Sequence, residues 1–224
     1  MKKALAALTL LPLALCGCGG VFDSKIAAPQ IYVLRLPAST APTPALTVGS
    51  VLVQRPEAGP GLDSNRIALL RSDRRFDFYS ASLWAAPAPD VLESVIVEAL
   101  RSTNAFSAVF DDAAPFAARY DLRCTMRRFE ADYTGHGDGS GNGNGGGAPT
   151  IHAALDCTLG RHRDRALLAS FTAQGSARAS EDRLGAVVAA FESATVTAMN
   201  ELARVVTTSV AETESAAAKS AASQ

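Results

Sequence analysis

Apolar and polar residues alternate in two segments that flank a glycine-rich tract. The segments are "RYDLRCTMRRF" (119–129) and "TIHAALDCTLG" (150–160), and the tract between them (134–147) holds eight glycines in fourteen residues. Such alternation is typical of strands that bury one face, and glycine favours the turn that joins them. The pattern therefore predicts a long antiparallel hairpin with a glycine-rich tip.

The two alternations agree in a single register. If the turn is centred near residue 141, facing residue numbers sum to about 281, and the members of each pair share one side of the hairpin. The apolar pairs are Leu122 with Leu159, Cys124 with Cys157, and Met126 with Leu155, while Arg123, Thr125, Arg127, Asp156 and Thr158 face the other way. A slip of one residue would turn every side chain over, so the agreement supports this pairing.

The facing cysteines leave two alternatives open. Cys124 and Cys157 either form a cross-strand disulfide, which an oxidising compartment would allow, or remain two buried thiols. Directly opposed strand positions give strained disulfide geometry, so two buried thiols are an equal alternative.

Shorter apolar runs predict the remaining strands. They cover residues 31–36, 46–54, 66–72, 75–80 and 165–179. The runs 66–72 and 75–80 are separated only by a short turn at Asp73, which predicts a second hairpin.

Two stretches have the apolar spacing of amphipathic helices. In the first, 90–103, apolar residues recur every three or four positions, with prolines before it and Asn104 after it. In the second, an apolar stripe runs from Leu184 over about 25 residues. Ser180 is expected as its N-cap, and the acidic residues 181 and 182 suit a first turn.

This order of elements predicts the fold class. Strands, a helix, long strands and a second helix favour a single α/β (α+β) domain over residues 31–211, with a mixed β-sheet and two main helices packed on it. From Glu212 the chain has no large apolar residue, so residues 212–224 are expected to form a disordered tail.

The first thirty residues have the layout of a lipoprotein precursor. A basic start, Met1-Lys2-Lys3, precedes an apolar run that ends at Leu15, which falls short of the roughly 20 residues needed to span a bilayer. Leu15-Cys16-Gly17-Cys18 resembles a bacterial lipobox, and Cys18 is the better acylation site because a small residue precedes it. Residues 1–17 are thus a predicted signal peptide and 18–30 a lipidated tether.

Acylation of Cys18 would fix the protein to a membrane without a spanning segment, because each buried methylene contributes about 0.8 kcal/mol. Gly19 stands where an aspartate would signal inner-membrane retention in many Gram-negative lipoproteins. By that resemblance, the expected location is the periplasmic face of the outer membrane.

Composition narrows the class of partner. After removal of residues 1–17, 19 basic residues remain against 22 acidic ones. This near balance gives no reason to expect a nucleic-acid partner, which would need a basic face. Besides Cys18, only Cys124 and Cys157 remain, so apolar burial and not a disulfide framework must stabilise the fold.

The sequence carries few signals for catalysis. The glycine tract is followed by a strand, whereas a phosphate-binding loop needs a helix there, and His136, His152 and His162 lack metal-ligand spacing. A GxSxG elbow is also missing from the sequence. We therefore expect no enzyme activity, no metal and no cofactor, with a hydrolytic or lipid-handling enzyme as the alternative.

Two short segments are candidate contact surfaces. "RSDRRFD" (71–77) is either a solvated hairpin tip or a docking surface for an acidic partner or lipid head groups. Tyr79, Leu83 and Trp84 form either part of the core or a partner contact, since aromatic residues are enriched in interfaces.

The chain resembles the auxiliary lipoproteins of bacterial ABC-type transport systems, the family that includes the lipoprotein of the paraquat-inducible complex. The lipobox, the early strands "IYVLRL" and "LTVGSVLV", and "NRIALLRSDRRFDFYSASLWAAPAPDVLESVIVEAL" followed by "STNAFSAVF" carry the resemblance. "SFTAQGSARA" leading into "AVVAAFESATVTAMNELA" supports it. The similarity covers roughly residues 30–210.

The resemblance implies an α/β sandwich that works beside an ABC ATPase, a permease and a substrate-binding protein of the mammalian-cell-entry type. Such systems move phospholipid or other hydrophobic molecules between the inner and outer membranes. The expected role is that of a docking component that self-associates or binds the mammalian-cell-entry subunit. An outer-membrane assembly lipoprotein is a further alternative.

Overall fold

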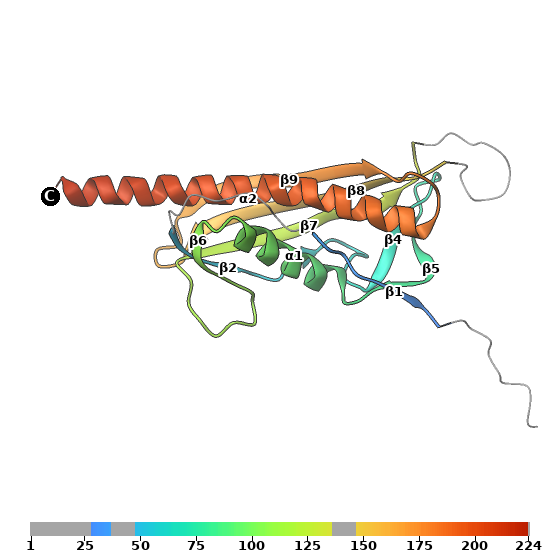
Figure 1. Ribbon diagram of the computed structural model, residues 1–224, viewed down its shortest axis with the longest axis horizontal. Helices are drawn as coiled ribbons and strands as arrows, with labels where there is room; N and C mark the ends of the chain where they lie inside the picture. The colour runs from blue at the N-terminus through green and yellow to red at the C-terminus, as the bar shows by residue number, and fades with distance from the viewer. Residues whose placement is uncertain (1–27, 37–47, 136–146, 224) are drawn as a thin grey trace, which may run out of the picture.

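A computed structural model describes residues 28–36, 48–135 and 147–223 and contains one mixed sheet and two helices (Figure 1). The strands are β1 (Gln30–Tyr32), β2 (Val48–Val53), β3 (Glu57–Ala58), β4 (Arg66–Leu70), β5 (Phe76–Trp84), β6 (Phe106–Phe110), β7 (Tyr120–Asp132), β8 (Thr150–Arg161) and β9 (Leu167–Arg178). The helices are α1 (Ala88–Ser102) and α2 (Leu184–Ala222). The predicted α/β class, with a mixed sheet and two main helices, is confirmed.

Strand β7 is the centre of the sheet. On one side it pairs with β8 in the predicted antiparallel register, in which Cys124 faces Cys157. On its other side β2, β3 and β4 follow one another along its length, all parallel to it. The long hairpin therefore carries the shorter strands.

A β-bulge interrupts this ladder after Met126. Beyond it the register shifts by one, so that Arg128 faces Ala154. The extra residue moves the buried positions from even to odd numbers, and Phe129 and Ala131 continue the apolar face that Met126 ends. Without the bulge, the second half of β7 would turn its polar side inward.

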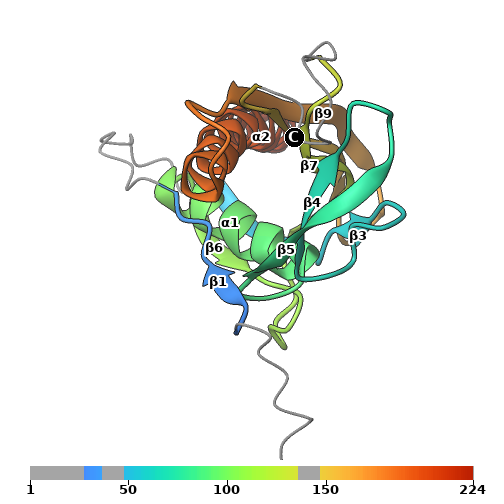
Figure 2. The same cartoon turned by 90° about the vertical axis from the view of Figure 1, so that its right-hand side faces the viewer.

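Both helices cover the apolar face of the sheet, which curves around them (Figure 2). The centre of the core is an aromatic cluster of Trp84, Phe129 and Phe191, with ring centroids 5.0 to 5.7 Å apart. These rings come from β5, β7 and α2. One cluster thus ties the second hairpin, the long hairpin and the C-terminal helix together.

Several element boundaries differ from those predicted. The strands β3 and β6 were not predicted, and β5 continues to Trp84 instead of ending at residue 80. The two-residue β3 owes its pairing to β7 and needs no apolar pattern of its own. Helix α1 ends at Ser102, just before Asn104, whose positive φ of 52° breaks the helical path.

The expected N-cap of α2 is wrong. The helix begins at Leu184, and Arg183 occupies the N-cap position without a side-chain capping bond. Asp182 instead accepts a hydrogen bond from the Tyr133 hydroxyl. This contact holds the residues before the helix against the end of β7, so Ser180 lies too early to cap it.

The segment after Glu212, expected to be disordered, is helical through Ala222. Glu214 anchors it, because its carboxylate accepts a hydrogen bond from Tyr120 and pairs with Arg119 at 3.0 Å. The residues that follow are mostly alanine and serine and lie exposed. Alanine is the best helix former, so this alanine-rich segment continues a helix that is already nucleated.

Gly175 sets the distance between β9 and α2. A Cβ atom at this position would lie 2.1 Å from the Ala194 carbonyl oxygen and 3.0 Å from the Ala198 nitrogen. Both are backbone atoms of α2 and cannot rotate away. We predict that Gly175→Ala lowers the free energy of unfolding by roughly 1–3 kcal/mol, the usual range for overpacking.

Denaturant unfolding followed by the fluorescence of Trp84, the single tryptophan, measures this loss. Gly185→Ala is the matched control, because a Cβ there meets nothing within 4 Å and alanine favours the helix. Equal stability of Gly175→Ala and the unaltered protein would show that the helix moves outward without cost.

Candidate functional site

The structure separates the three residues proposed as core or partner contact. Trp84 is 1% exposed and packs in the aromatic cluster, so the partner-contact interpretation is wrong for it. Leu83 is partly buried and lies opposite Ile31 of β1. Tyr79 lines a hollow.

The hollow beside Tyr79 has a volume of about 520 Å³ and lies at the end of the sheet where α2 begins. We call it the tyrosine hollow. It is lined by Leu69, Arg71, Phe78, Tyr79, Tyr133, Asp182 and Leu184, together with residues of the β4–β5 turn. Apolar side chains and hydroxyl groups thus share one concave surface.

A chain of hydrogen bonds crosses the tyrosine hollow. Tyr133 donates to Asp182 at 2.5 Å, and because its single proton is used there, Tyr79 donates to Tyr133 at 2.8 Å. Burial raises the pKa of Tyr79 to about 12. Burial and the bond to Asp182 raise the pKa of Tyr133 well above its ordinary value. Both hydroxyls therefore stay protonated and act as hydrogen-bond donors, not as bases.

The charged run 71–77 is mostly paired within itself. Arg71 pairs with Asp77 at 2.7 Å and Arg75 with Asp73 at 2.5 Å. The Arg74 side chain has no hydrogen bond or ion pair within the described residues. This arrangement fits a solvated hairpin tip at the rim of the tyrosine hollow.

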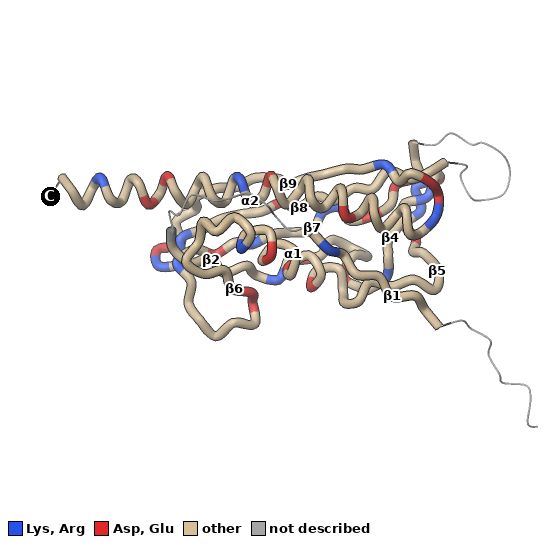
Figure 3. The backbone as a smooth tube through the Cα atoms, in the orientation of Figure 1, with Lys and Arg blue, Asp and Glu red and all other residues tan. Residues whose placement is uncertain are grey.

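A second hollow lies at the opposite end of the sheet, around the turn between β8 and β9. Its volume is about 560 Å³, and we call it the arginine hollow. It is lined by Asp121, Arg123, Thr158, Gly160, Arg161, His162, Arg165 and Leu167. Figure 3 shows basic residues gathered at this turn, below the C-terminal part of α2. The sequence signal for this hollow is the basic run Arg161-His162-Arg163-Asp164-Arg165. No site was predicted there.

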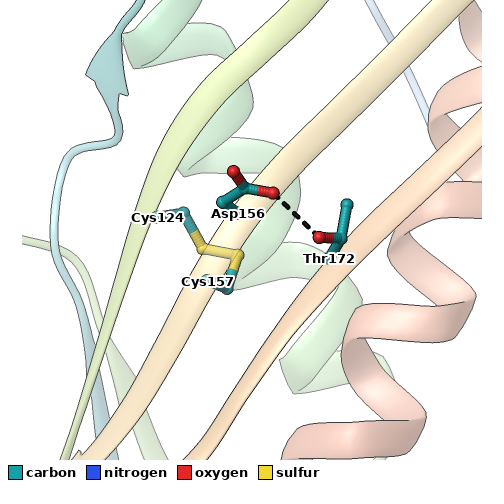
Figure 4. The surroundings of a disulfide bond; sticks show 4 residues. All are labelled: Cys124, Asp156, Cys157 and Thr172. Atoms are coloured by element: carbon teal, nitrogen blue, oxygen red, sulfur yellow. Dashed lines mark hydrogen bonds between the residues drawn. A yellow bond between two sulfur atoms is a disulfide. The ribbon is translucent and has the colours of Figure 1, made fainter.

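The disulfide alternative is the one present in the structure. Cys124 and Cys157 are joined across β7 and β8, and both are almost fully buried. Figure 4 shows the bond beside Asp156, which accepts a hydrogen bond from Thr172 of β9 at 2.8 Å. The bond therefore joins β7 to β8, and β9 lies on the other side of β8.

The histidines lie apart. His136 and the expected lipidation site Cys18 fall outside the described residues. His152 lies 3.7 Å from Asp132, and burial, with nearby Arg128, lowers its pKa. His162 contacts Asp121 at 2.9 Å at the other end of β8. Within residues 28–36, 48–135 and 147–223, no group of His, Cys, Asp and Glu is arranged to hold a metal ion.

Residues 32–211 match the family described as ABC-type transport auxiliary lipoprotein component. The match runs from Tyr32, the last residue of β1, through all the later strands and most of α2. The chain belongs to this family. It is therefore a lipoprotein auxiliary to ABC-type transport, and the resemblance read from the sequence is confirmed. None of the curated proteins matches the chain.

Solved structures share the fold. A protein of Xanthomonas campestris from the DUF330 family is 27% identical, over 83% of this chain and 99% of that chain, with a TM-score of 0.70. A crystal structure described as an uncharacterized protein is 16% identical, over 80% of this chain and 99% of that one, with a TM-score of 0.60. The second likeness concerns the fold alone.

No helix within the described part of the chain combines the length and the apolar character required to cross a bilayer.

The disulfide closes a loop of 33 residues, which predicts a substantial contribution to stability. Loop-closure entropy gives about 3 to 4 kcal/mol for a loop of this size. We expect a reductant to lower the free energy of unfolding by about that amount. Urea unfolding with and without dithiothreitol measures the change.

The Cys124→Ala/Cys157→Ala double variant is the control for this experiment. Its stability should not respond to dithiothreitol, because it has no bond to reduce. A reductant effect of equal size in the double variant would exclude the disulfide as its source.

The tyrosine hollow predicts a loss of stability at high pH. Tyr79 has a folded pKa of about 12, whereas an unfolded tyrosine titrates near 10. Below that lower value both states hold the proton, and as the pH rises the unfolded state loses it first, so stability falls between about pH 10 and 12. Tyr79→Phe should make this decline shallower by about 1.4 kcal/mol per pH unit. Unfolding midpoints at a series of alkaline pH values measure the slope, and an unchanged slope would contradict the assignment.

Proposed function

We propose that this protein is a docking lipoprotein of an ABC-type intermembrane lipid transport system, anchored through Cys18 to the periplasmic face of the outer membrane. Its partners would be the substrate-binding protein of the mammalian-cell-entry type and the ABC permease and ATPase of the same system. The family match over residues 32–211 carries the transport assignment. The finer statements rest on the lipobox and on the shape of the domain.

The two ends of the domain suit a docking role. The described chain begins beside β1 at one end of the long axis, and the β8–β9 turn lies at the other end (Figure 1). Cys18 precedes Ala28 by ten residues, a length that spans at most about 35 Å when extended. An anchor at Cys18 would therefore keep the β1 end near the membrane and direct the arginine hollow away from it.

The chemistry of the described residues supports an auxiliary role over catalysis. The tyrosine hollow offers protonated hydroxyls, because Tyr133 and Tyr79 keep their protons at neutral pH, and the Asp182 carboxylate in its lining accepts the Tyr133 hydrogen bond. In the proposed complex, ATP would be bound and hydrolysed by the ATPase subunit. The domain itself would contribute position and contact.

Affinity purification of the full-length protein from gently solubilised envelopes tests this proposal. We expect the mammalian-cell-entry protein and the ABC permease to co-purify, and Cys18 to carry acyl chains by intact-mass measurement. Cys18→Ala should remove the acyl chains and the outer-membrane fraction of the protein, and should reduce the recovery of partners.

Cys16→Ala is the matched control. It removes the neighbouring cysteine but leaves Gly17 and Cys18, so acylation and recovery should equal those of the unaltered protein. Recovery of neither partner by the unaltered protein would overturn the docking role. Acylation that persists in Cys18→Ala would overturn the anchor.

A further inference from the structure

The two hairpin turns at opposite ends of the sheet have the same design. In each, an aspartate carboxylate accepts the backbone N–H two residues later, Asp73 from Arg75 and Asp164 from Ala166. The residue between them is an arginine with positive φ, 65° at Arg74 and 56° at Arg165. Glycine or asparagine adopts that conformation at lower cost. Each turn therefore keeps an arginine at a position where its backbone is disfavoured.

The two turns differ in the charges around that arginine. At the β4–β5 turn the neighbouring arginines, Arg71 and Arg75, are neutralised by close carboxylates. At the arginine hollow, Arg123 and Arg165 line the same concave surface, and neither side chain has a hydrogen bond or ion pair within the described residues. Arg161 adds a third guanidinium, paired only with Asp164 at 3.0 Å.

The other groups of the arginine hollow complete an anion-binding surface. Thr158 lies directly opposite Arg123 in the β7–β8 ladder, so a hydroxyl donor stands beside a free guanidinium. Asp121 is held by His162 at 2.9 Å and does not pair with either free arginine. Arginine presents a planar fork of N–H donors that matches phosphate oxygens in pairs.

We propose that the arginine hollow binds the phosphodiester group of a phospholipid, with Arg123 and Arg165 as the principal phosphate ligands. Leu167 favours a lipid over a free phosphate, because this leucine borders the hollow and is 66% exposed. An apolar side chain at the rim suits the glycerol and acyl region that follows the phosphate. The volume of about 560 Å³ lies in the range of small-ligand sites.

This inference deepens the proposed function, on which it rests for the source of the lipid. Phospholipid delivered to the end of the domain away from the anchor would meet the hollow first. Binding itself depends only on the described residues, so it can be measured without the transport proteins.

The test titrates dihexanoyl-phosphatidylglycerol into the purified full-length protein in a nonionic detergent, with binding measured by native mass spectrometry. We expect saturable binding of one lipid, weakened by salt because the contact is electrostatic. The double variant Arg123→Gln/Arg165→Asn should reduce the affinity about tenfold or more, since it removes two charge-assisted contacts. Asparagine is chosen at position 165 because it tolerates a positive φ.

Arg74→Asn is the matched control. It removes an arginine with the same backbone conformation and an equally unpaired side chain from the opposite turn, so it should leave lipid binding unchanged. An equal loss in Arg74→Asn would overturn the assignment of the site to the arginine hollow. Equal binding by the double variant and the unaltered protein would overturn it as well.

Soluble anions distinguish the source of the phosphate. Inorganic phosphate and glycerol 3-phosphate should compete only weakly, because they cannot contact Leu167 through an acyl region. Competition as strong as that of the lipid would overturn the phospholipid and leave a simple anion site. Stronger competition by polyglutamate would overturn it in favour of an acidic protein surface. Co-purification of the transport proteins without lipid binding would overturn this inference alone and leave the docking role intact.

Discussion

The antiparallel ladder between β7 and β8 is the interaction on which the rest of the domain depends. It is the longest pairing of β7, and one face of it is apolar from Leu122 to Ala131. Every other strand is attached directly or indirectly to this hairpin. Because side chains alternate along a strand, its register decides which residues α1 and α2 can cover. The disulfide between Cys124 and Cys157 locks that register at one pair.

The length of β7 decides how the sheet is built on the side away from β8. A strand of thirteen residues twists along its length, and no single short strand could follow it on the other side. Three short strands pair with it in succession instead, β2 near its start, β3 at its middle and β4 at its end. The result is an elongated sheet whose two ends present different turns and different hollows.

The sequence predicted those features that are encoded by local pattern. The alternation around Cys124 and Cys157 sufficed for the register, and the spacing from Leu184 sufficed for the second helix. The bulge at Arg127, the pairing of β3 and the helical tail beyond Glu214 depend on contacts between distant segments. The tail illustrates the reason: Tyr120 and Arg119, nearly a hundred residues earlier, hold Glu214 in place. Local composition alone contains no trace of that contact.

The charges in the sequence likewise do not reveal the candidate sites. The chain is almost neutral as a whole, at −1, and most arginines spread along it are paired with a nearby carboxylate. A count of charges therefore predicts no basic surface. Only the fold places Arg123 of β7 and Arg165 of the β8–β9 turn on one concave surface, while Asp164 pairs with Arg161 and Asp121 contacts His162 through Oδ2. Two unpaired guanidinium groups on one concave surface keep their capacity to bind an anion, whereas a paired arginine must first give up its carboxylate. The unpaired Arg123 of β7, next to a turn whose own arginine is also unpaired, is what assigns the proposed anion site to the end of the sheet remote from β1.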